Sequence, residues 1–408
     1  MKLKSEYLDD GTNFFKIDPL FINPDDLTQF SLYEKKSESN NQFRFRCLLL
    51  DTSSITKQRL MELLKSWENI YINKQQINCY NTYLKNNLTH ILKHENINVS
   101  RKTGLLKDIS MEVVKQTFET NFEGIKDKKT ALKNIETLVS RSLGFISDIK
   151  SLNGIAELIG HDYDTHTHSI KVAWLMAVFI NANLDLFTIQ SKEQRRYLLT
   201  EAAVAGMLHD IGKVKIPKNI LQKKGKLDNL EYLLIQGHTA YSTILLFNSG
   251  LSDQAMEAIL YHHENEDGSG YPCGLSSENI PMLAKICHIA DVFDALTSKR
   301  HYKAAKSPLE ALKIMTGQNP FLETLLQFEK EARENIKTPV TAHVRDDYEA
   351  RLRRLREKEM LEAESQKRVE ARMKIRDKGM AHCFNTELLK RFIFTLNRSE
   401  SFQLSQLL

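Results

Sequence analysis

His262-His263-Glu264-Asn265-Glu266-Asp267-Gly268-Ser269-Gly270-Tyr271-Pro272 is the most informative stretch of this 408-residue chain. It places two adjacent histidines at a predicted helix end, followed by an acidic loop. Gly268 and Gly270 allow tight turns with positive φ, and Pro272 stiffens the exit. Neighbouring side chains on a helix diverge by about 100°, so two adjacent ligands indicate a metal in a crowded pocket. The alternative interpretation is an ordinary solvated loop.

The composition is that of a soluble globular protein, with 41% hydrophobic and 27% charged residues. A net charge of +5 is too small to indicate binding to a nucleic acid polymer by itself. The five cysteines occur singly and no secretory leader is evident, so we expect reduced thiols in the cytoplasm. The apolar runs are too short to span a membrane. The low proline and glycine content favours a mostly helical protein.

Three regions differ in their sequence pattern. Residues 1–95 contain an alternating segment at 41–50, a helical pattern at 56–65 and a short apolar segment at 70–72, which predict a small α+β module. This module has no cluster of histidines, cysteines or paired acids, so we expect a regulatory or packing role. Residues 96–150 predict helices that either link this module to an output domain or begin the bundle of the next one. Residues 151–408 are expected to form that next domain.

Residues of metal-binding type also stand upstream of the double histidine. Asp164 and His168 are four residues apart, so one helix face can present both. His209 and Asp210 follow the apolar helical run 198–208, and burial of an uncompensated charge there would be costly. That cost favours coordination of a cation by the pair.

Two further candidates lie within apolar helical patterns. His238 on its own would more often be a core histidine than a ligand. Asp291 is surrounded by Ile, Val, Phe and Leu and therefore needs a partner. Asp294, one helical turn later, could cap or pair locally instead.

Together these residues point to one type of chemistry. Five histidines with Asp210 and Asp291 exceed the four ligands of a structural zinc site. Nitrogen and oxygen donors without cysteine suit iron, manganese, nickel or zinc in a multinuclear centre. Paired ions about 3.5–4 Å apart clamp a phosphodiester and hold a hydroxide nucleophile. Lys213, Arg300 and Lys303 add positive charge that fits a phosphate substrate, so we predict metal-assisted phosphoester hydrolysis.

The motifs that carry the pattern are His168, HDIGK at 209–213, His238, HHENEDGSGYP at 262–272 and DVFDALTSKRHYK at 291–303. Their order resembles the HD-GYP family within the HD phosphohydrolases, over roughly residues 150–316. The resemblance implies an all-helical domain that hydrolyses cyclic di-GMP to the linear dinucleotide pGpG, or onward to GMP.

The resemblance also implies a role for each matched residue, with iron or manganese as the divalent ions. One ion would be held by His168, His209, Asp210 and Asp291, and the second by His238, His262 and His263, with Asp210 bridging both. Asp210 and Lys213 would be the catalytic residues. Lys213, Arg300 and Lys303 would bind phosphate, and Tyr271 would line the substrate groove.

This chain departs from the family at two positions. Many relatives carry tyrosine where Asp164 stands, and relatives with a carboxylate there resemble a subset with a third metal ion, in which glutamate is the usual form. We expect Asp164 to be a ligand of a third ion; the alternative is a hydrogen bond that orients His168. His301 replaces the proline usual after the arginine.

The C-terminal part contains an addition to the family pattern. Residues 308–315 and 382–396 predict the last helices of the domain, and about 320–378 is extra. Dense mixed charge there predicts a projecting helix or helical hairpin, which serves either as a spacer or as an arm for a homodimer or protein partner.

Two other functions remain open. The first is hydrolysis of another cyclic dinucleotide. The second is a sensor that binds the dinucleotide without turnover and signals through residues 1–95 or the arm. The complete ligand set favours an enzyme over a sensor.

Overall fold

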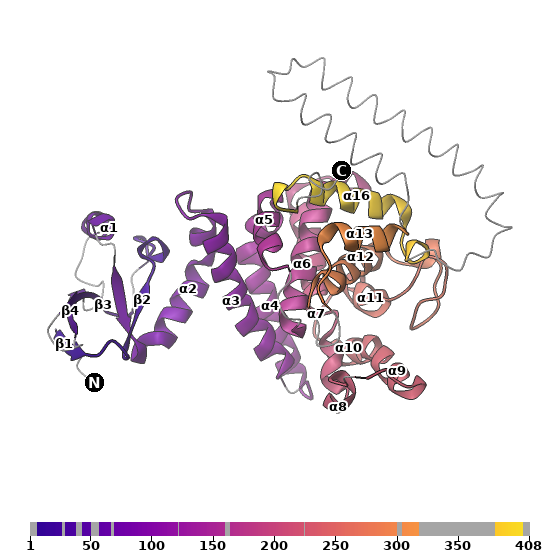
Figure 1. Cartoon of the computed structure of the whole chain (residues 1–408), viewed down its shortest axis with the longest axis horizontal. Helices are drawn as coiled ribbons and strands as arrows, with labels where there is room; N and C mark the ends of the chain where they lie inside the picture. Colours follow the sequence, from indigo (N-terminus) through magenta and orange to yellow (C-terminus); the bar gives the residue numbers. More distant parts are fainter. Residues whose placement is uncertain are drawn as a thin grey trace, which may run out of the picture.

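The computed structural model describes residues 6–26, 29–37, 43–49, 57–66, 69–120, 122–159, 164–223, 225–299, 304–317 and 380–402. In these ranges a small sheet at one end is followed by a long series of helices (Figure 1), which confirms the prediction of a mainly helical chain with an N-terminal α+β part. The charged insertion expected at 320–378 lies outside the described residues. None of the described helices combines the length and hydropathy of a transmembrane segment.

The N-terminal sheet is antiparallel, with strand order β1-β4-β3-β5-β2. The alternating pattern at 41–50 correctly predicted a strand, which the structure places at Phe43–Leu49. In this strand Phe45 is buried, and its neighbours Arg44 and Arg46 are exposed. Phe45 stacks on Phe14 with a ring-centroid distance of 4.0 Å. The elements are β1 (Glu6–Asp9), β2 (Phe14–Ile17), β3 (Leu32–Ser37), β4 (Phe43–Leu49), α1 (Lys57–Ser66) and β5 (Ile70–Asn73).

Four helices connect the sheet to the rest of the chain: α2 (Ile77–Lys93), α3 (Val99–Phe118), α4 (Ile125–Ile146) and α5 (Leu152–Glu157). The helices α3 and α4 both pack against α6 (Thr165–Ala182), and α4 also packs against α7 (Lys192–Leu208). Their buried side chains belong to the same hydrophobic core as those helices. This packing favours the alternative in which residues 96–150 begin the helical bundle.

The remaining helices are α6 (Thr165–Ala182), α7 (Lys192–Leu208), α8 (Lys218–Leu221), α9 (Asn229–Gln236), α10 (His238–Leu246), α11 (Asp253–Tyr261), α12 (Met282–Thr297), α13 (Pro308–Thr316) and α16 (Thr386–Asn397). Helix α6 is the centre of the bundle (Figure 1), since every residue from His168 to Ile180 is buried. A helix that is apolar on all sides must be covered all round, and α3, α7, α12 and α16 cover it.

The approach of α6 and α7 is unusually close. A Cβ atom at Gly206 would lie 2.7 Å from Cα of Ala173, so only glycine allows this packing. As a result the C-terminal end of α7, with His209, lies beside the first turns of α6, with His168. The two imidazole centroids are 5.2 Å apart.

Ile135→Ala tests whether α4 is part of the bundle. Ile135 is 0% exposed, so its truncation should lower the free energy of unfolding by about 2–5 kcal/mol, measured by urea denaturation. Ile125→Ala on the same helix is the matched control, because Ile125 is 55% exposed and should change stability by less than about 0.5 kcal/mol. Equal effects of the two substitutions would contradict the packing of α4.

Candidate metal centre

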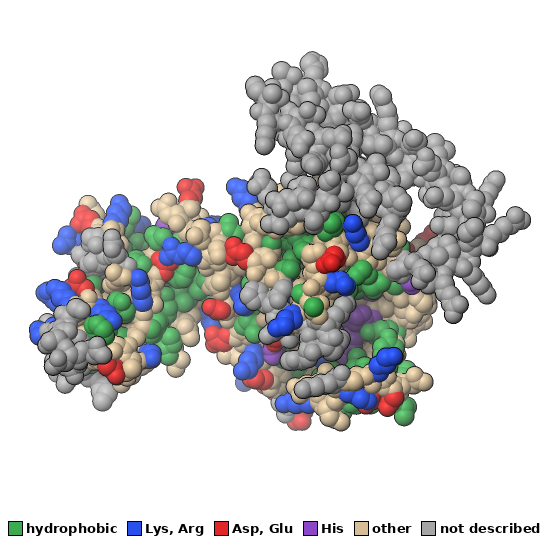
Figure 2. Space-filling model, in the orientation of Figure 1, with side chains coloured by type: hydrophobic (Ala, Val, Ile, Leu, Met, Phe, Trp, Pro, Cys, Tyr) green, Lys and Arg blue, Asp and Glu red, His purple; other side chains and the backbone are tan. Residues whose placement is uncertain are grey.

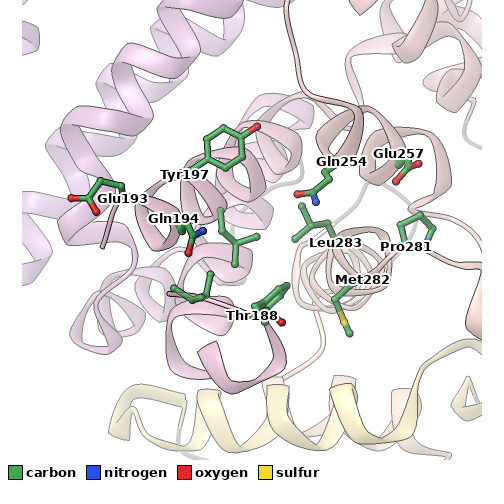
Figure 3. A pocket seen from close by; sticks show the side chains of 12 residues that line it. Thr188, Glu193, Gln194, Tyr197, Gln254, Glu257, Pro281, Met282 and Leu283 are labelled. Carbon is green, nitrogen blue, oxygen red and sulfur yellow. The ribbon is translucent and has the colours of Figure 1, made fainter. Parts of the chain in front are cut away.

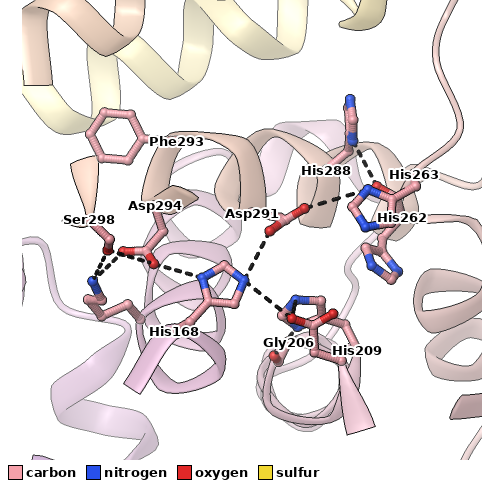
Figure 4. A network of polar contacts seen from close by, with 12 residues as sticks. His168, Gly206, His209, His262, His263, His288, Asp291, Phe293, Asp294 and Ser298 are labelled. Atoms are coloured by element: carbon pink, nitrogen blue, oxygen red, sulfur yellow. Dashed lines mark hydrogen bonds and ion pairs between the residues drawn. The ribbon is translucent and has the colours of Figure 1, made fainter. Parts of the chain in front are cut away.

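The structure brings seven of the predicted ligands together around the start of α6. Figure 4 labels five of them: His168, His209, His262, His263 and Asp291. Ligand atoms within 4.8 Å of one another form three groups: His168, His209 and Asp291; His209, Asp210 and His262; and His238, His262 and His263. Shared members join the groups into one cluster. The seven residues come from α6, the end of α7, the start of α10, the end of α11 and the middle of α12.

Asp210 lies between two sets of histidines. Its Oδ2 atom is 3.4 Å from Nε2 of His209 and 3.6 Å from Nε2 of His168. Its Oδ1 atom is 3.3 Å from Nε2 of His238. The two oxygens of one carboxylate therefore face different ligand groups, which is the arrangement required for a bridge between two cations.

Three of the histidines are held by the same backbone contact. The Nδ1 atoms of His209, His238 and His262 donate to the carbonyl oxygen three residues earlier, at 2.8, 2.6 and 2.7 Å. This hydrogen bond keeps the proton on Nδ1 and leaves the Nε2 lone pair directed into the cluster. Burial lowers the pKa of His238 to about 4 and holds the pKa of His262 well below its usual value. Neutral imidazole is the form that binds a metal ion.

The two carboxylates remain ionised despite their burial. Burial opposes the charge of Asp210, but the Lys213 ammonium and His209 hold its pKa well below the usual range. Lys213 forms an ion pair with Oδ2 of Asp210. For Asp291 burial also opposes the charge, while His168, with Nε2 at 3.0 Å from Oδ1, holds the pKa well below its usual value.

The donor set fits a bound cation. Nε2 of His209 and Oδ1 of Asp210 are buried atoms without a hydrogen-bond partner among the described residues. Buried polar atoms of folded proteins nearly always have a hydrogen-bond partner. An imidazole lone pair and a carboxylate oxygen are both acceptors, so these atoms cannot form a hydrogen bond with each other. A divalent cation would satisfy both atoms at once.

A second layer of contacts orients His168 from behind, and sequence reasoning did not identify it. Nδ1 of His168 is 2.7 Å from Oδ2 of Asp294, and Nζ of Lys171 is 2.6 Å from Oδ1 of the same carboxylate (Figure 4). Lys171 also donates to Ser298 at 2.7 Å. Both charged residues are buried, so each requires the other. The signal available in the sequence was their spacing, three residues after His168 and three after Asp291.

Glycine in the HDIGK motif has a steric reason. A Cβ atom at Gly212 would lie 2.0 Å from the carbonyl oxygen of His238. The hydroxyl of Ser242 accepts from the N–H of Gly212 at 2.8 Å and donates to the carbonyl of His209 at 2.9 Å. These contacts hold the loop after α7 against α10 and thereby bring Asp210 to His238.

The loop after His263 folds back onto the cluster. The carboxylate of Glu264 accepts from the N–H groups of Cys273 at 2.7 Å and Leu275 at 2.9 Å. The Tyr271 N–H donates to the His263 carbonyl at 3.1 Å, and the two rings lie 4.8 Å apart. Tyr271 therefore lies beside His263, and its role in lining a substrate groove stays a prediction.

The prediction for the two glycines of this loop is half right. Gly268 has a φ of +79°, as expected. Gly270 is not among the residues with positive φ, and the prediction for it is wrong. Its requirement is steric instead, because a Cβ atom there would lie 2.3 Å from the backbone nitrogen of Asn265.

Asp164 differs from its expected placement. It is the N-cap of α6 with an extended backbone, so the prediction that it shares a helix face with His168 is wrong. Its carboxylate accepts from the N–H groups of His166 and Thr167 and also contacts Nδ1 of His166 at 3.0 Å. None of the three ligand groups includes it. Its role as a metal ligand stays a prediction, and Arg300 and Lys303 lie outside the described residues.

The cluster reaches the surface close to α10 and α11, where Figure 2 shows histidine atoms next to hydrophobic side chains. His263 is the most accessible member, with 21% of its side chain exposed. A separate cavity of 710 Å³ lies between α7, α11 and the start of α12 (Figure 3). Tyr197, Gln254 and Leu283 are among the residues that line it, and none of the seven cluster residues does.

Comparison with known proteins finds similarity over the part of the chain that carries six of the seven cluster residues. Residues 186–320 match the family model described as HD domain. A Pseudomonas aeruginosa protein named cyclic di-GMP phosphodiesterase is 36% identical over 170 residues, which cover 41% of this chain and 39% of that protein. A Thermotoga maritima protein with the same name is 35% identical over 191 residues, covering 45% of this chain and 49% of that protein.

A third relative carries a different name. A Vibrio cholerae protein named 3'3'-cGAMP-specific phosphodiesterase 2 is 50% identical over 101 residues, which cover 24% of this chain and 19% of that protein. The chain spans about half or less of the length of each of these three relatives.

Asp294→Asn tests the layer behind His168. The substitution removes the negative charge that holds Nδ1 of His168 and Lys171, so metal affinity should fall by about 10–100-fold, measured by competition with a chelator. Asp253→Asn, at the exposed start of α11, should leave the affinity unchanged. Unchanged metal affinity in Asp294→Asn would show that Asp294 only neutralises Lys171.

Proposed function

We propose that this chain is a metal-dependent phosphodiesterase of the HD-GYP family that hydrolyses cyclic di-GMP to pGpG or GMP. The observation that carries the proposal is Asp210, a buried carboxylate whose two oxygens face separate histidine groups. The names of the relatives from Pseudomonas aeruginosa and Thermotoga maritima supply the substrate.

We assign two divalent ions to the centre. His168, His209 and Asp291 would hold one, His238, His262 and His263 the other, and Asp210 would bridge them. Such a pair supplies a hydroxide nucleophile at neutral pH and stabilises charge on the phosphate. Iron or manganese fits, since all donors are nitrogen or oxygen and no cysteine of the described residues belongs to the ligand groups.

The protein's own residues position the substrate and complete the centre. The Lys213 ammonium forms an ion pair with Asp210, and 20% of the Lys213 side chain is exposed. Its positive charge therefore lies at the edge of the centre, where it can also contact a phosphate oxygen. The Tyr271 ring beside His263 forms one wall of the groove. Arg300 and Lys303 are proposed to bind the phosphates on the strength of the motif that contains them.

The wider predictions are part of the same proposal. Residues 151–408 form the catalytic domain and residues 1–95 regulate it. The enzyme acts in the cytoplasm, and a homodimer or protein partner binds through the N-terminal module or the charged insertion at 320–378.

Hydrolysis of 3'3'-cGAMP is a second candidate function. It is favoured by the 50% identity over 101 residues to the Vibrio cholerae protein of that name. The two substrates share the cyclic phosphodiester ring and differ in one base. The metal centre serves either substrate, so contacts to the bases decide between them.

Product analysis with the purified, metal-loaded chain tests the function. Cyclic di-GMP should be converted to pGpG or GMP, and Asp210→Ala should lower turnover by more than about a hundredfold, because the variant loses a ligand of both ions. Asp253→Ala should retain wild-type turnover. Faster conversion of 3'3'-cGAMP would establish the second candidate, and binding without conversion of either nucleotide would establish a sensor.

Asp164→Asn tests the number of ions. Asparagine is an equally good N-cap, so helix α6 should start as before. The predicted third ion gives three ions per chain in the wild type, measured by elemental analysis, whereas two ions in both wild type and variant would show that the Asp164 carboxylate serves only His166 and Thr167. A decrease from three ions to two would show that Asp164 is a ligand.

A further inference from the structure

A second cavity, with basic side chains in its lining, lies where the helices that follow the N-terminal sheet meet the HD domain. It has a volume of 730 Å³ and is lined by residues of α2, α3, α4, the turn after α4 and the first half of α7. None of the metal-cluster residues lines it. We propose that this cavity binds a phosphate-rich small molecule of the nucleoside polyphosphate class.

The charge of the lining is strongly one-sided. Its one acidic residue, Asp148, already accepts a hydrogen bond from the N–H of Lys150 at 2.8 Å. Like charges gathered from several helices repel one another, and this cost points to an anion that is bound there. The seven basic residues of the lining are Lys93, Lys102, Arg141, Lys150, Lys192, Arg195 and Arg196.

The chain itself does little to neutralise these charges. In the described part of the structure no ion pair involves Lys93, Lys150 or Lys192. Arg195 donates to the side-chain oxygen of Asn181 at 2.6 Å, and Arg196 donates to the hydroxyl of Ser140 at 2.7 Å. These acceptors are neutral, so the guanidinium charges remain available.

A third arginine is held in the same way. Arg141 donates to the carbonyl oxygen of Lys85 at 2.6 Å and to the side chain of Asn86 at 3.2 Å, both neutral acceptors on α2. These bonds fix the guanidinium between α2 and α4. A fixed guanidinium loses little conformational entropy when it binds a phosphate.

The size and the remaining lining indicate the rest of the ligand. A volume of 730 Å³ is within the range of about 300–1,000 Å³ for small-molecule sites. Apolar side chains between the basic ones provide contact area for a base and sugar. These apolar residues are Leu92, Val99, Leu143, Phe145 and Leu199. An inorganic phosphate would leave that surface unused, whereas a nucleoside polyphosphate uses both parts.

The location links the cavity to the metal centre through one helix. Lys192, Arg195 and Arg196 lie in the first two turns of α7, and the same helix ends at Leu208, directly before His209 and Asp210. A ligand held between α4 and α7 therefore contacts the element that carries two metal ligands. Binding here does not depend on the hydrolytic function proposed above.

Calorimetric titration of the metal-loaded full chain with GTP, ATP and pyrophosphate tests the proposal. Lys93→Glu/Lys192→Glu should weaken nucleotide binding by at least about tenfold, because it removes two charge-assisted contacts and adds repulsion. Lys93→Gln/Lys192→Gln should weaken it less. Lys129→Glu/Lys133→Glu is the matched control with the same change of net charge, on an exposed part of α4, and should stay within about twofold of wild type.

Asp210→Ala separates this cavity from the metal centre. Nucleotide that binds the cavity should bind this variant as it binds wild type, whereas nucleotide on the metal ions should be lost. Loss of binding in Asp210→Ala, full binding in Lys93→Glu/Lys192→Glu, or equal weakening in the control would overturn the proposal. Absence of nucleotide binding to the wild type would overturn it as well.

Discussion

Both oxygens of the buried Asp210 carboxylate face histidines. Much of the surrounding structure offsets the free-energy cost of burying this charge. An ionised carboxylate inside an apolar bundle is costly unless positive charge meets it directly. Lys213 provides one such charge, and cations held with the surrounding imidazoles would provide the rest. Helices α7, α10 and α11 each end or begin at this point, and each delivers one or two of the groups that the carboxylate requires.

Backbone contacts set the precision of the centre. Hydrogen bonds to carbonyl oxygens of the preceding turn fix the rings of His209, His238 and His262 on their own helices. His168 lacks such a bond and is held instead by Asp294, which Lys171 neutralises. The orientations of these four rings are therefore set by the protein itself, which is the preorganisation that a metal site requires.

The bundle gives α7 a double role. Its first turns contribute three basic side chains to the basic cavity between α2, α3, α4 and α7, and its last residue precedes the His209-Asp210 pair. Glycine at position 206 lets the end of this helix lie directly on α6. The same helix that contributes to the metal centre therefore also reaches the region where the N-terminal helices join.

The sequence alone was sufficient to predict that five histidines and two carboxylates gather in one cluster. Such residues next to apolar helical runs are costly without a common partner, and this cost is a local property of each segment. The sequence was also sufficient for strand β4, whose alternation of Phe and Arg can bury one face only. Tertiary structure decided the rest. Whether Asp294 meets His168 depends on how α12 crosses α6, and whether Asp164 caps a helix or continues it depends on where α6 begins. The basic cavity combines residues from positions 89 to 199 that share no local pattern. Such sites arise from contacts between elements that are distant in the chain, and no spacing rule within one helix encodes them.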